Sequence, residues 1–493
     1  MGAGSFSARS VARALTPIDG AWLYVFRVFY GLVLGISMLR FLAYGWIERL
    51  FLQPFQFKYY GFEWVMPLAR EQMHTLFVVM LGLALAMTVG LAFRVAASLF
   101  AIGLAYVQLI DVTTYLNHYY LAALLAGLLA VSPAGKRWSL DALIRAKFRA
   151  FQGRPSALPG AQVSSVWLWL FRFQIAVVYT FAGLAKLQPD WLLHAQPLRI
   201  WLAASTSLPV IGKLFTWPGV ALALSWCGFL FDSTIVWFLL HRRTRVPAYL
   251  VVIVFHVFTR VLFPIGMFPA IMVLSALVFF SPSWPRHAVS VMRSAWDRAE
   301  RAFGAAGKIP SVLRHEITGS HGQPSASLST VGVMPRVGLG LAAAYCAFQL
   351  LFPLRFLVYG GNVLWHEQGM RFSWRVMVRA KGGATTFIVR DERNGHVYHV
   401  NPHTYLTGMQ ESEMSSQPDL ILQLAHHIAK DFARRGIHPV SVRADTHVSL
   451  NGRRSTAMID PNVDLLKERD GFGLAHFVTP APPVRPPHTR TVF

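Results

Sequence analysis

The chain has 493 residues, of which 54% are hydrophobic and only 14% are charged, whereas roughly 25% of the residues in an average soluble domain are charged. This composition excludes an ordinary soluble protein and indicates an integral membrane protein. A formal net charge of +23 suggests a nucleic-acid partner in a soluble protein. Here the basic residues fall mostly in short loops between apolar segments, a pattern that orients membrane proteins. We therefore expect the lipid bilayer, and no nucleic acid, as a partner.

Runs of about 20 apolar residues predict nine transmembrane spans. The runs are residues 22–43, 75–92, 95–112, 116–132, 166–185, 218–240, 247–262, 264–281 and 333–353. The connections 133–165, 241–246 and 282–332 are rich in Lys and Arg, and the positive-inside rule places them in the cytoplasm. Counting spans from these loops puts the N-terminus in the cytoplasm. Everything after residue 354 then lies outside, in the periplasm or extracellular space, or in the lumen of a eukaryotic organelle.

The chain divides into four predicted parts. They are residues 1–281 with eight spans, residues 282–332 with a basic helix and a Gly/Ser/Pro-rich cytoplasmic linker over 307–332, a ninth span at 333–353, and an exterior domain at 354–493. The predicted fold class is a multi-pass α-helical membrane bundle followed by an exterior, β-rich α+β domain.

The exterior part shows three patterns of secondary structure. FSWRVMVRAK and ATTFIVRD alternate like two paired strands around Gly382-Gly383, which predicts a hairpin. PDLILQLAHHIAKDFARRG predicts an amphipathic helix that ends at a glycine. VSVRADTHVSL returns to the alternation of a strand.

Polar residues interrupt the apolar runs in three places, at Asn117-His118, at Lys186, and at His256 with Arg260. Polar groups at membrane depth are costly and are functional candidates by default. Each cluster alone is more often a helix cap or an interfacial anchor, but the predicted topology puts all three at the outer side. Together they predict a site that faces the outer leaflet. A lysine that acts there as a base needs the neutral amine, which desolvation favours.

The ordered motifs NHYYL, VVYTFAGLAKLQPDW, FHVFTRVLFPIGMF, SPSWPR, SWRVMVRAK and SLNGRRSTAMIDPNVDL resemble the vitamin K-dependent gamma-glutamyl carboxylases and their bacterial relatives with an HTTM membrane domain. The resemblance covers nearly the full chain. It implies that Lys186 is the base that deprotonates reduced vitamin K, supported by Asn117 and His118. The residues that it implies around the cofactor are Tyr179, His256, Phe263 and Met267.

The resemblance also implies the reaction. Reduced vitamin K, either phylloquinol or menaquinol, reacts with O2 on the way to its epoxide and yields a strong base. That base removes a γ-hydrogen from a peptide glutamate, and the carbanion captures CO2. Such an enzyme is a peptidyl-glutamate 4-carboxylase, of the carbon–carbon lyase class. The quinol carries the difficult chemistry, and no metal is expected.

Basic residues of the exterior domain are implied to contact the carboxylate of the glutamate-containing peptide or protein. The matching positions are Arg379 and Lys381, with Arg453 as a further candidate. An arginine fork suits a carboxylate, but the alternative is that these are solvated strand residues beside an exposed hairpin.

Two other functions remain open at this point. The chain reads RAKGG where the animal enzymes carry histidines, and Cys227 and Cys346 cannot form the exterior disulfide of those enzymes. These departures favour, as one alternative, a quinol epoxidase without carboxylation. The second alternative is a non-catalytic membrane protein for binding or transport, although the internal repeats common in transporters are not evident.

Overall fold

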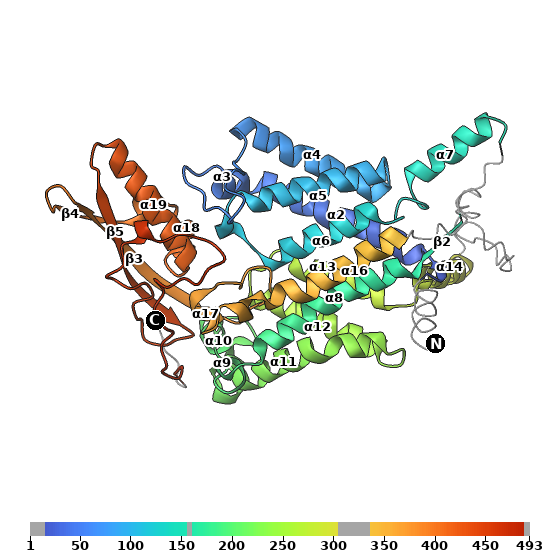
Figure 1. The fold of residues 1–493 in the computed structure, drawn as a ribbon. Helices are drawn as coiled ribbons and strands as arrows, with labels where there is room; N and C mark the ends of the chain where they lie inside the picture. Colours follow the sequence, from blue (N-terminus) through green and yellow to red (C-terminus); the bar gives the residue numbers. More distant parts are fainter. Residues whose placement is uncertain (1–14, 155–159, 304–335, 488–493) are drawn as a thin grey trace, which may run out of the picture.

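The computed structural model of the protein describes residues 15–154, 160–303 and 336–487. A bundle of helices forms most of the molecule, and a β-rich domain lies at one end of it (Figure 1). The elements of the bundle are β1 (Pro17–Asp19), α2 (Ala21–Ala43), α3 (Trp46–Phe51), α4 (Arg70–Val89), α5 (Phe93–Leu109), η1 (Val112–Thr114), α6 (Asn117–Val131), α7 (Leu140–Phe151), β2 (Gln162–Ser164), α8 (Ser165–Lys186), α9 (Pro189–Leu192), α10 (Leu198–Ala204), η2 (Gly212–Thr216), α11 (Pro218–Leu240), α12 (Arg245–Leu262), α13 (Phe268–Ala276), η3 (Leu277–Phe279), α14 (Trp284–Phe303), α16 (Arg336–Leu351) and η4 (Phe352–Val358). Those of the C-terminal domain are α17 (Val363–His366), β3 (Lys381–Asp391), β4 (Val397–Val400), η5 (Pro402–Thr404), α18 (Gly408–Met414), α19 (Pro418–Arg434), β5 (Val440–Leu450) and η6 (Leu465–Lys467).

Six helical segments of the described residues are long and apolar enough to cross a membrane. They are α2, α4, α8, α11, α12 and residues Val337–Val358, a segment made up of α16 without its first residue and η4. A seventh is counted if α13 and η3 are joined to α14 across a bend of 97°. Each of the nine predicted runs contains a helix, but a count of nine spans is not confirmed.

The helices α5 and α6 are too short to be counted as membrane spans, because a polar turn separates them. The side chain of Asp111 accepts hydrogen bonds from the backbone N–H and the hydroxyl of Thr113, at 2.8 and 2.7 Å, and this turn ends one helix before the next begins. The 17 residues of α5 extend about 26 Å, less than the roughly 30 Å of a hydrocarbon layer.

Glycines set the spacing of two helix pairs in the bundle. A Cβ at Gly31 of α2 would lie 2.4 Å from the hydroxyl oxygen of Thr88 in α4. A Cβ at Gly183 of α8 would lie 2.7 Å from the hydroxyl oxygen of Ser233 in α11. Only a residue without a side chain allows such close approach. The second contact brings the end of α8 against the middle of α11.

The basic connections lie at the end of the bundle opposite the β-rich domain. Figure 1 places α7 and α14 at that end, near β2. Arg286 of α14 pairs with Asp19 of β1 at 2.7 Å. The predicted linker over 307–332 lies outside the described residues.

The C-terminal domain is built on a three-stranded antiparallel sheet in the order β4-β3-β5. Helix α19 packs on β5, and its predicted apolar face lies in the domain core with side chains of the sheet. The core includes Phe387, Val389, Leu420, Leu424, Ile428 and Val442. The chain leaves α19 through Gly436, which has a φ of +79°. The helix, its glycine stop and the strand at 440–450 were therefore predicted correctly.

The predicted hairpin around Gly382-Gly383 is wrong. Both glycines lie inside β3 and pair with Ser449 and Val448 of β5. A Cβ at Gly383 would lie 2.7 Å from the carbonyl oxygen of His447. The close approach of the two strands explains the glycine at 383, whereas a Cβ at Gly382 would meet nothing within 4 Å.

Residues 367–380, which we name the junction segment, run from α17 to β3 without forming a strand. Four non-glycine residues in it have positive φ: Glu367 and Phe372 at 60°, Trp374 at 58° and Met377 at 55°. Such left-handed conformations are incompatible with a regular strand. The alternating pattern of SWRVMVRAK thus reflects an irregular segment with one side against the bundle.

Candidate active site

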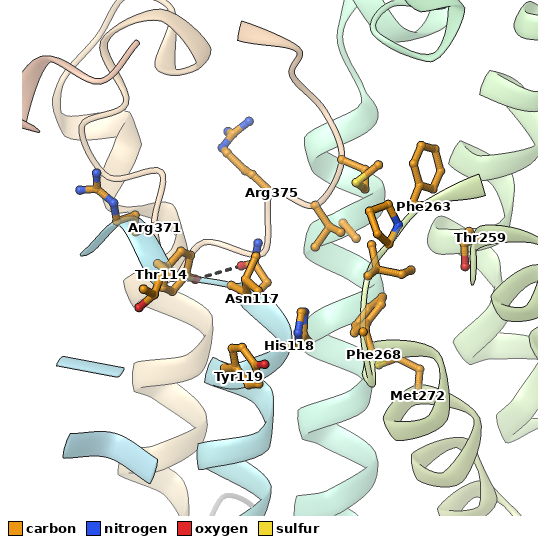
Figure 2. A pocket seen from close by; sticks show the side chains of 18 of the residues that line it. Thr114, Asn117, His118, Tyr119, Thr259, Phe263, Phe268, Met272, Arg371 and Arg375 are labelled. Carbon is orange, nitrogen blue, oxygen red and sulfur yellow. Dashed lines mark hydrogen bonds between the residues drawn. The ribbon is translucent and has the colours of Figure 1, made fainter. Parts of the chain in front are cut away.

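A cavity of about 1200 Å³ lies where the bundle meets the C-terminal domain. The bundle contributes a mostly apolar wall, which includes Phe41, Met80, Leu104, Val178, Phe255, Phe268 and Met272. The C-terminal domain contributes a charged wall, which includes Glu367, Arg371, Arg375, Arg379 and Glu413. Figure 2 shows side chains of α6, of the connection between α12 and α13, and of the junction segment around the same space.

Lys186, the last residue of α8, is 5% exposed and lines this cavity. Its ammonium Nζ donates to Oδ2 of Asp232 at 2.7 Å and to the carbonyl oxygens of Ala182 and Val376 at 3.3 and 3.4 Å. The ring of Trp191 lies 5.2 Å from Nζ. An anchoring lysine extends its head group toward water, whereas this one is buried and held by a carboxylate.

Asp232 of α11 is the residue that the sequence interpretation missed. Its side chain lines the cavity and is 7% exposed. It is the one acidic residue in the apolar run 218–240, and a lone carboxylate at membrane depth is itself a signal of function. The contact of Gly183 with Ser233 places Asp232 beside Lys186.

Asn117 and His118 open α6 and both line the cavity. The amide oxygen of Asn117 accepts a hydrogen bond from the Tyr115 hydroxyl at 3.0 Å. The imidazole of His118 packs against the rings of Tyr119 and Phe268, with centroids 4.5 and 5.9 Å away. Figure 2 shows both side chains beside the cavity, below Arg375 in that view.

His256 and Tyr179 form a hydrogen-bonded pair on the bundle wall. The Tyr179 hydroxyl lies 3.0 Å from Nε2 of His256, and both residues line the cavity. The other ring nitrogen of His256, Nδ1, is buried and has no hydrogen-bond partner among the described residues. A buried polar atom without a partner is costly.

The two remaining predicted cofactor residues differ in position. Phe263 lines the cavity and packs edge-to-face on Trp201 at 5.4 Å. Met267 precedes α13, packs against the bundle core, and is not among the described residues that line the cavity.

Arg379 and Lys381 share one carboxylate, that of Glu367. Arg379 lines the cavity and pairs with Glu367. Lys381 lies behind the cavity wall, where Nζ is 3.0 Å from Oε1 of Glu367 and 2.5 Å from the carbonyl oxygen of Trp365. Burial lowers the pKa of Lys381 to about 8, against the opposing effect of Glu367. The alternative, that these are solvated strand residues, is therefore wrong for Lys381, whose side chain is 1% exposed.

Arg453 lies away from the cavity lining and joins the two domains. Its Nη1 and Nη2 donate to the two carboxylate oxygens of Asp190 at 2.6 and 2.7 Å. Asn451 donates to the same carboxylate at 2.8 Å. Burial alone raises the pKa of Asp190, but the hydrogen bonds from Arg453 and Asn451 bring it below the usual value. Asp190 follows Lys186 by four residues, so this ion pair fixes the C-terminal domain next to Lys186.

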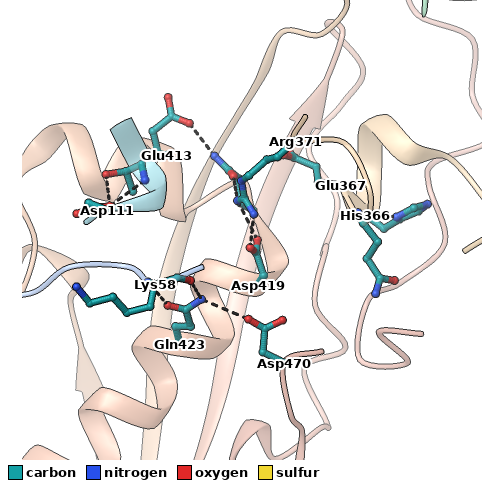
Figure 3. A network of polar contacts seen from close by, with 12 residues as sticks. Lys58, Asp111, His366, Glu367, Arg371, Glu413, Asp419, Gln423 and Asp470 are labelled. Carbon is teal, nitrogen blue, oxygen red and sulfur yellow. Dashed lines mark hydrogen bonds and ion pairs between the residues drawn. The ribbon is translucent and has the colours of Figure 1, made fainter. Parts of the chain in front are cut away.

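Arg371 anchors the junction segment to α19. Its guanidinium donates to Oδ2 of Asp419 at 2.6 Å and to the amide oxygen of Gln417 at 2.5 Å. Figure 3 shows this ion pair near Gln423, whose amide oxygen accepts from the backbone N–H of Lys58 at 2.8 Å. These contacts hold the C-terminal domain over the cavity.

Comparison with protein families accounts for most of the chain. Residues 15–284 match the family model of the HTTM domain. Residues 335–483 match that of the vitamin K-dependent gamma-carboxylase, lumenal domain. The chain belongs to the HTTM family and is a relative of the vitamin K-dependent gamma-carboxylases. No solved structure matches it.

The cavity of this gamma-carboxylase relative lies between its two matched domains. The structure brings Lys186, Asn117, His118, His256, Tyr179, Phe263 and Arg379 to one cavity. It leaves Met267, Lys381 and Arg453 outside the cavity lining. Among the described residues, no group of three or more His, Cys, Asp or Glu is placed to hold a metal ion.

Proposed function

We propose that this protein is a vitamin K-dependent gamma-carboxylase-like membrane enzyme. It couples oxygenation of a reduced naphthoquinone, phylloquinol or menaquinol, to carboxylation of glutamate in a peptide or protein. The observation that carries the proposal is the buried Lys186–Asp232 pair, in a cavity with an apolar wall toward the bundle and a charged wall toward the C-terminal domain.

The cavity fits a bicyclic quinol with an isoprenoid tail. Its volume of about 1200 Å³ and its aliphatic and aromatic bundle wall suit a flat apolar ring system. The side chains of Asn117 and His118, which line the cavity, supply polar contacts for the quinol oxygens. When bound, the quinol supplies, together with O2, a base strong enough for the γ-hydrogen of glutamate, which no side chain is.

The Lys186–Asp232 pair accepts the proton that the quinol hydroxyl loses. In the ion-paired form the carboxylate takes the proton directly. In the neutral form, reached when Lys186 passes its own proton to Asp232, the amine takes it. The two groups at 2.7 Å act as one coupled unit. The buried, water-poor surroundings favour transfer within the cavity.

The charged wall presents the glutamate substrate. Arg379 faces the cavity and pairs with Glu367 on this wall, while Lys381 and Arg453 act as positioning residues for the wall and for the domain. The N-terminus lies in the cytoplasm and the C-terminal domain lies outside, in the periplasm, the extracellular space or a lumen. The separation of α7 and α14 from the C-terminal domain supports this orientation (Figure 1).

A second candidate function is quinol epoxidation without carboxylation. The observation that favours it is the engagement of both Arg379 and Lys381 by Glu367, which leaves neither cation fully available to a substrate carboxylate.

The test uses the purified full chain in lipid nanodiscs with reduced naphthoquinone, O2, labelled CO2 and a glutamate-containing peptide. The coupled enzyme forms both epoxide and acid-stable label in the peptide, and Lys186→Ala loses both. Epoxide without label identifies the epoxidase. Absence of epoxide from the wild-type protein contradicts both proposals.

A further inference from the structure

The lining of the cavity carries an excess of positive charge. Seven lining residues are cationic, namely Arg40, Arg49, Lys186, Arg260, Arg371, Arg375 and Arg379, and three are acidic, namely Asp232, Glu367 and Glu413. Each acidic side chain already has a partner: Asp232 holds Lys186, Glu367 holds Arg379, and Glu413 accepts from Gln417. A cavity whose lining has a net positive charge attracts an anion.

Arg375 is the cation on the domain wall that its surroundings leave unpaired. Among the described residues it has no ion pair and no hydrogen bond, and its Nε is buried without a partner. Its guanidinium lies 3.9 Å from the ring centroid of Phe356. Stacking on an aromatic face holds the guanidinium plane while leaving the N–H groups free. The side chain is half-buried, and a partly desolvated cation without a counter-ion costs free energy, which a bound anion reduces.

Neighbouring residues hold Arg375 close to Lys186. The carbonyl oxygen of the next residue, Val376, lies 3.4 Å from Nζ of Lys186. The preceding residue, Trp374, is fully buried and stacks on Tyr120 with ring centroids 4.9 Å apart. Both Trp374 and Met377 have positive φ, a costly conformation that persists only where packing imposes it.

A glycine supports the stacking partner of Arg375. Gly369 has a φ of +77°, and a Cβ there would lie 2.7 Å from Cα of Phe356. The junction segment therefore packs directly on the backbone that carries Phe356, and this packing fixes the ring under Arg375.

We propose that Arg375 is the receptor for the side-chain carboxylate of the substrate glutamate, which it binds through the free N–H groups of its guanidinium. The proposal rests on the proposed function for the identity of the anion. It assigns recognition to Arg375 rather than to Arg379 or Lys381, which Glu367 already occupies. A planar fork suits a planar carboxylate, and the position next to Val376 puts that carboxylate in the same cavity as Lys186.

The test is a binding measurement that does not depend on catalysis. A fluorescent glutamate-containing peptide and the same peptide with glutamine are titrated against the full chain in phosphatidylcholine nanodiscs, whose zwitterionic lipid avoids a competing anionic headgroup. The wild-type protein binds the glutamate peptide more tightly. Arg375→Gln lowers the affinity for the glutamate peptide by about 10- to 100-fold, which is the factor for a lost hydrogen bond to a charged group. It leaves the affinity for the glutamine peptide unchanged.

Two variants control this result. Arg375→Lys retains the charge without the fork and recovers part of the loss. Arg454→Gln removes an exposed cation of the same domain outside the described cavity lining, and it leaves the affinity for the glutamate peptide within about twofold, since screening weakens distant charges.

Three outcomes overturn the proposal. They are an equal loss of affinity in Arg375→Gln and Arg454→Gln, an equal loss for the glutamate and glutamine peptides, and no preference for the glutamate peptide in the wild-type protein. Selective glutamate binding through Arg375 in a protein that forms no epoxide supports the receptor and rejects the proposed function, so the two failures are distinguishable.

Discussion

The ammonium of Lys186 at the end of α8 lies 2.7 Å from the carboxylate of Asp232 in the middle of α11. Both side chains are almost completely buried. Because little water reaches this buried site, the carboxylate balances the charge of the ammonium. The pair can therefore hold or release one proton.

Asp232→Asn leaves Lys186 without its counter-ion and removes one of the two proton acceptors. We expect epoxide formation to fall by about 100-fold or more, the range for loss of a general base. The measurement is the initial rate of epoxide formation from reduced naphthoquinone. Cys227→Ser, on the same helix and also in the cavity lining, is the control and retains at least half of the rate. Full activity of Asp232→Asn contradicts the role of the pair.

Gly183→Ala separates α8 from α11. The added Cβ lies 2.7 Å from the hydroxyl and 3.1 Å from the backbone nitrogen of Ser233, so the helix backbones must shift. We expect a loss of about 1–3 kcal/mol in the free energy of unfolding and reduced epoxide formation. Gly127→Ala, in α6 with nothing within 4 Å of its Cβ, leaves both quantities nearly unchanged. Similar effects of the two substitutions refute the close-approach explanation.

The Arg453–Asp190 ion pair couples the two domains. In a double-mutant cycle of Arg453→Met and Asp190→Asn, we expect an interaction energy of about 1–3 kcal/mol, measured by thermal unfolding of the full chain. Arg454→Met, at the exposed neighbouring residue, serves as the control. An interaction energy near zero contradicts the coupling.

The same ion pair predicts a pH dependence in acid. The pKa of Asp190 is below its usual value of 3.8 in the folded protein, because hydrogen bonds from Arg453 and Asn451 outweigh the effect of burial. The stability that the pair contributes is therefore present above pH 3.8 and is lost as the pH falls through the folded pKa. Arg453→Met reduces this loss, which unfolding curves between pH 5 and 3 measure.

Lys381 predicts a pH dependence in base. Burial lowers the pKa of Lys381 from 10.5 to about 8 in the folded protein, so the unfolded chain binds more protons between these values. The free energy of unfolding gains a contribution of the order of 3 kcal/mol as the pH rises through this window. Lys381→Met removes that contribution, whereas replacing the exposed Lys467 by Met does not. Identical slopes for the two variants between pH 8 and 10.5 exclude a buried, titrating Lys381.

Local patterns in the sequence predicted the helices and the polar ends of the site. Apolar runs and basic loops indicated the bundle, and the amphipathic stretch at 418–434 indicated α19, because hydropathy and helix periodicity are properties of neighbouring residues. Asn117, His118 and Lys186 were recognised because a polar residue in an apolar run stands out. The same rule, applied to the run 218–240, would have found Asp232.

The tertiary structure decided which of these residues meet. The contact of Gly183 with Ser233 places Asp232 against Lys186, 46 residues apart in the chain. Long-range pairing with β5 places Gly382 and Gly383 inside a strand. Local turn chemistry had predicted a hairpin turn at these two residues. The sequence by itself determined a membrane bundle with a polar end and a β-rich domain, since those depend on composition and periodicity. Only the packing of distant segments decided that Lys186 is ion-paired, that Arg453 joins the domains, and that Arg375 is left unpaired.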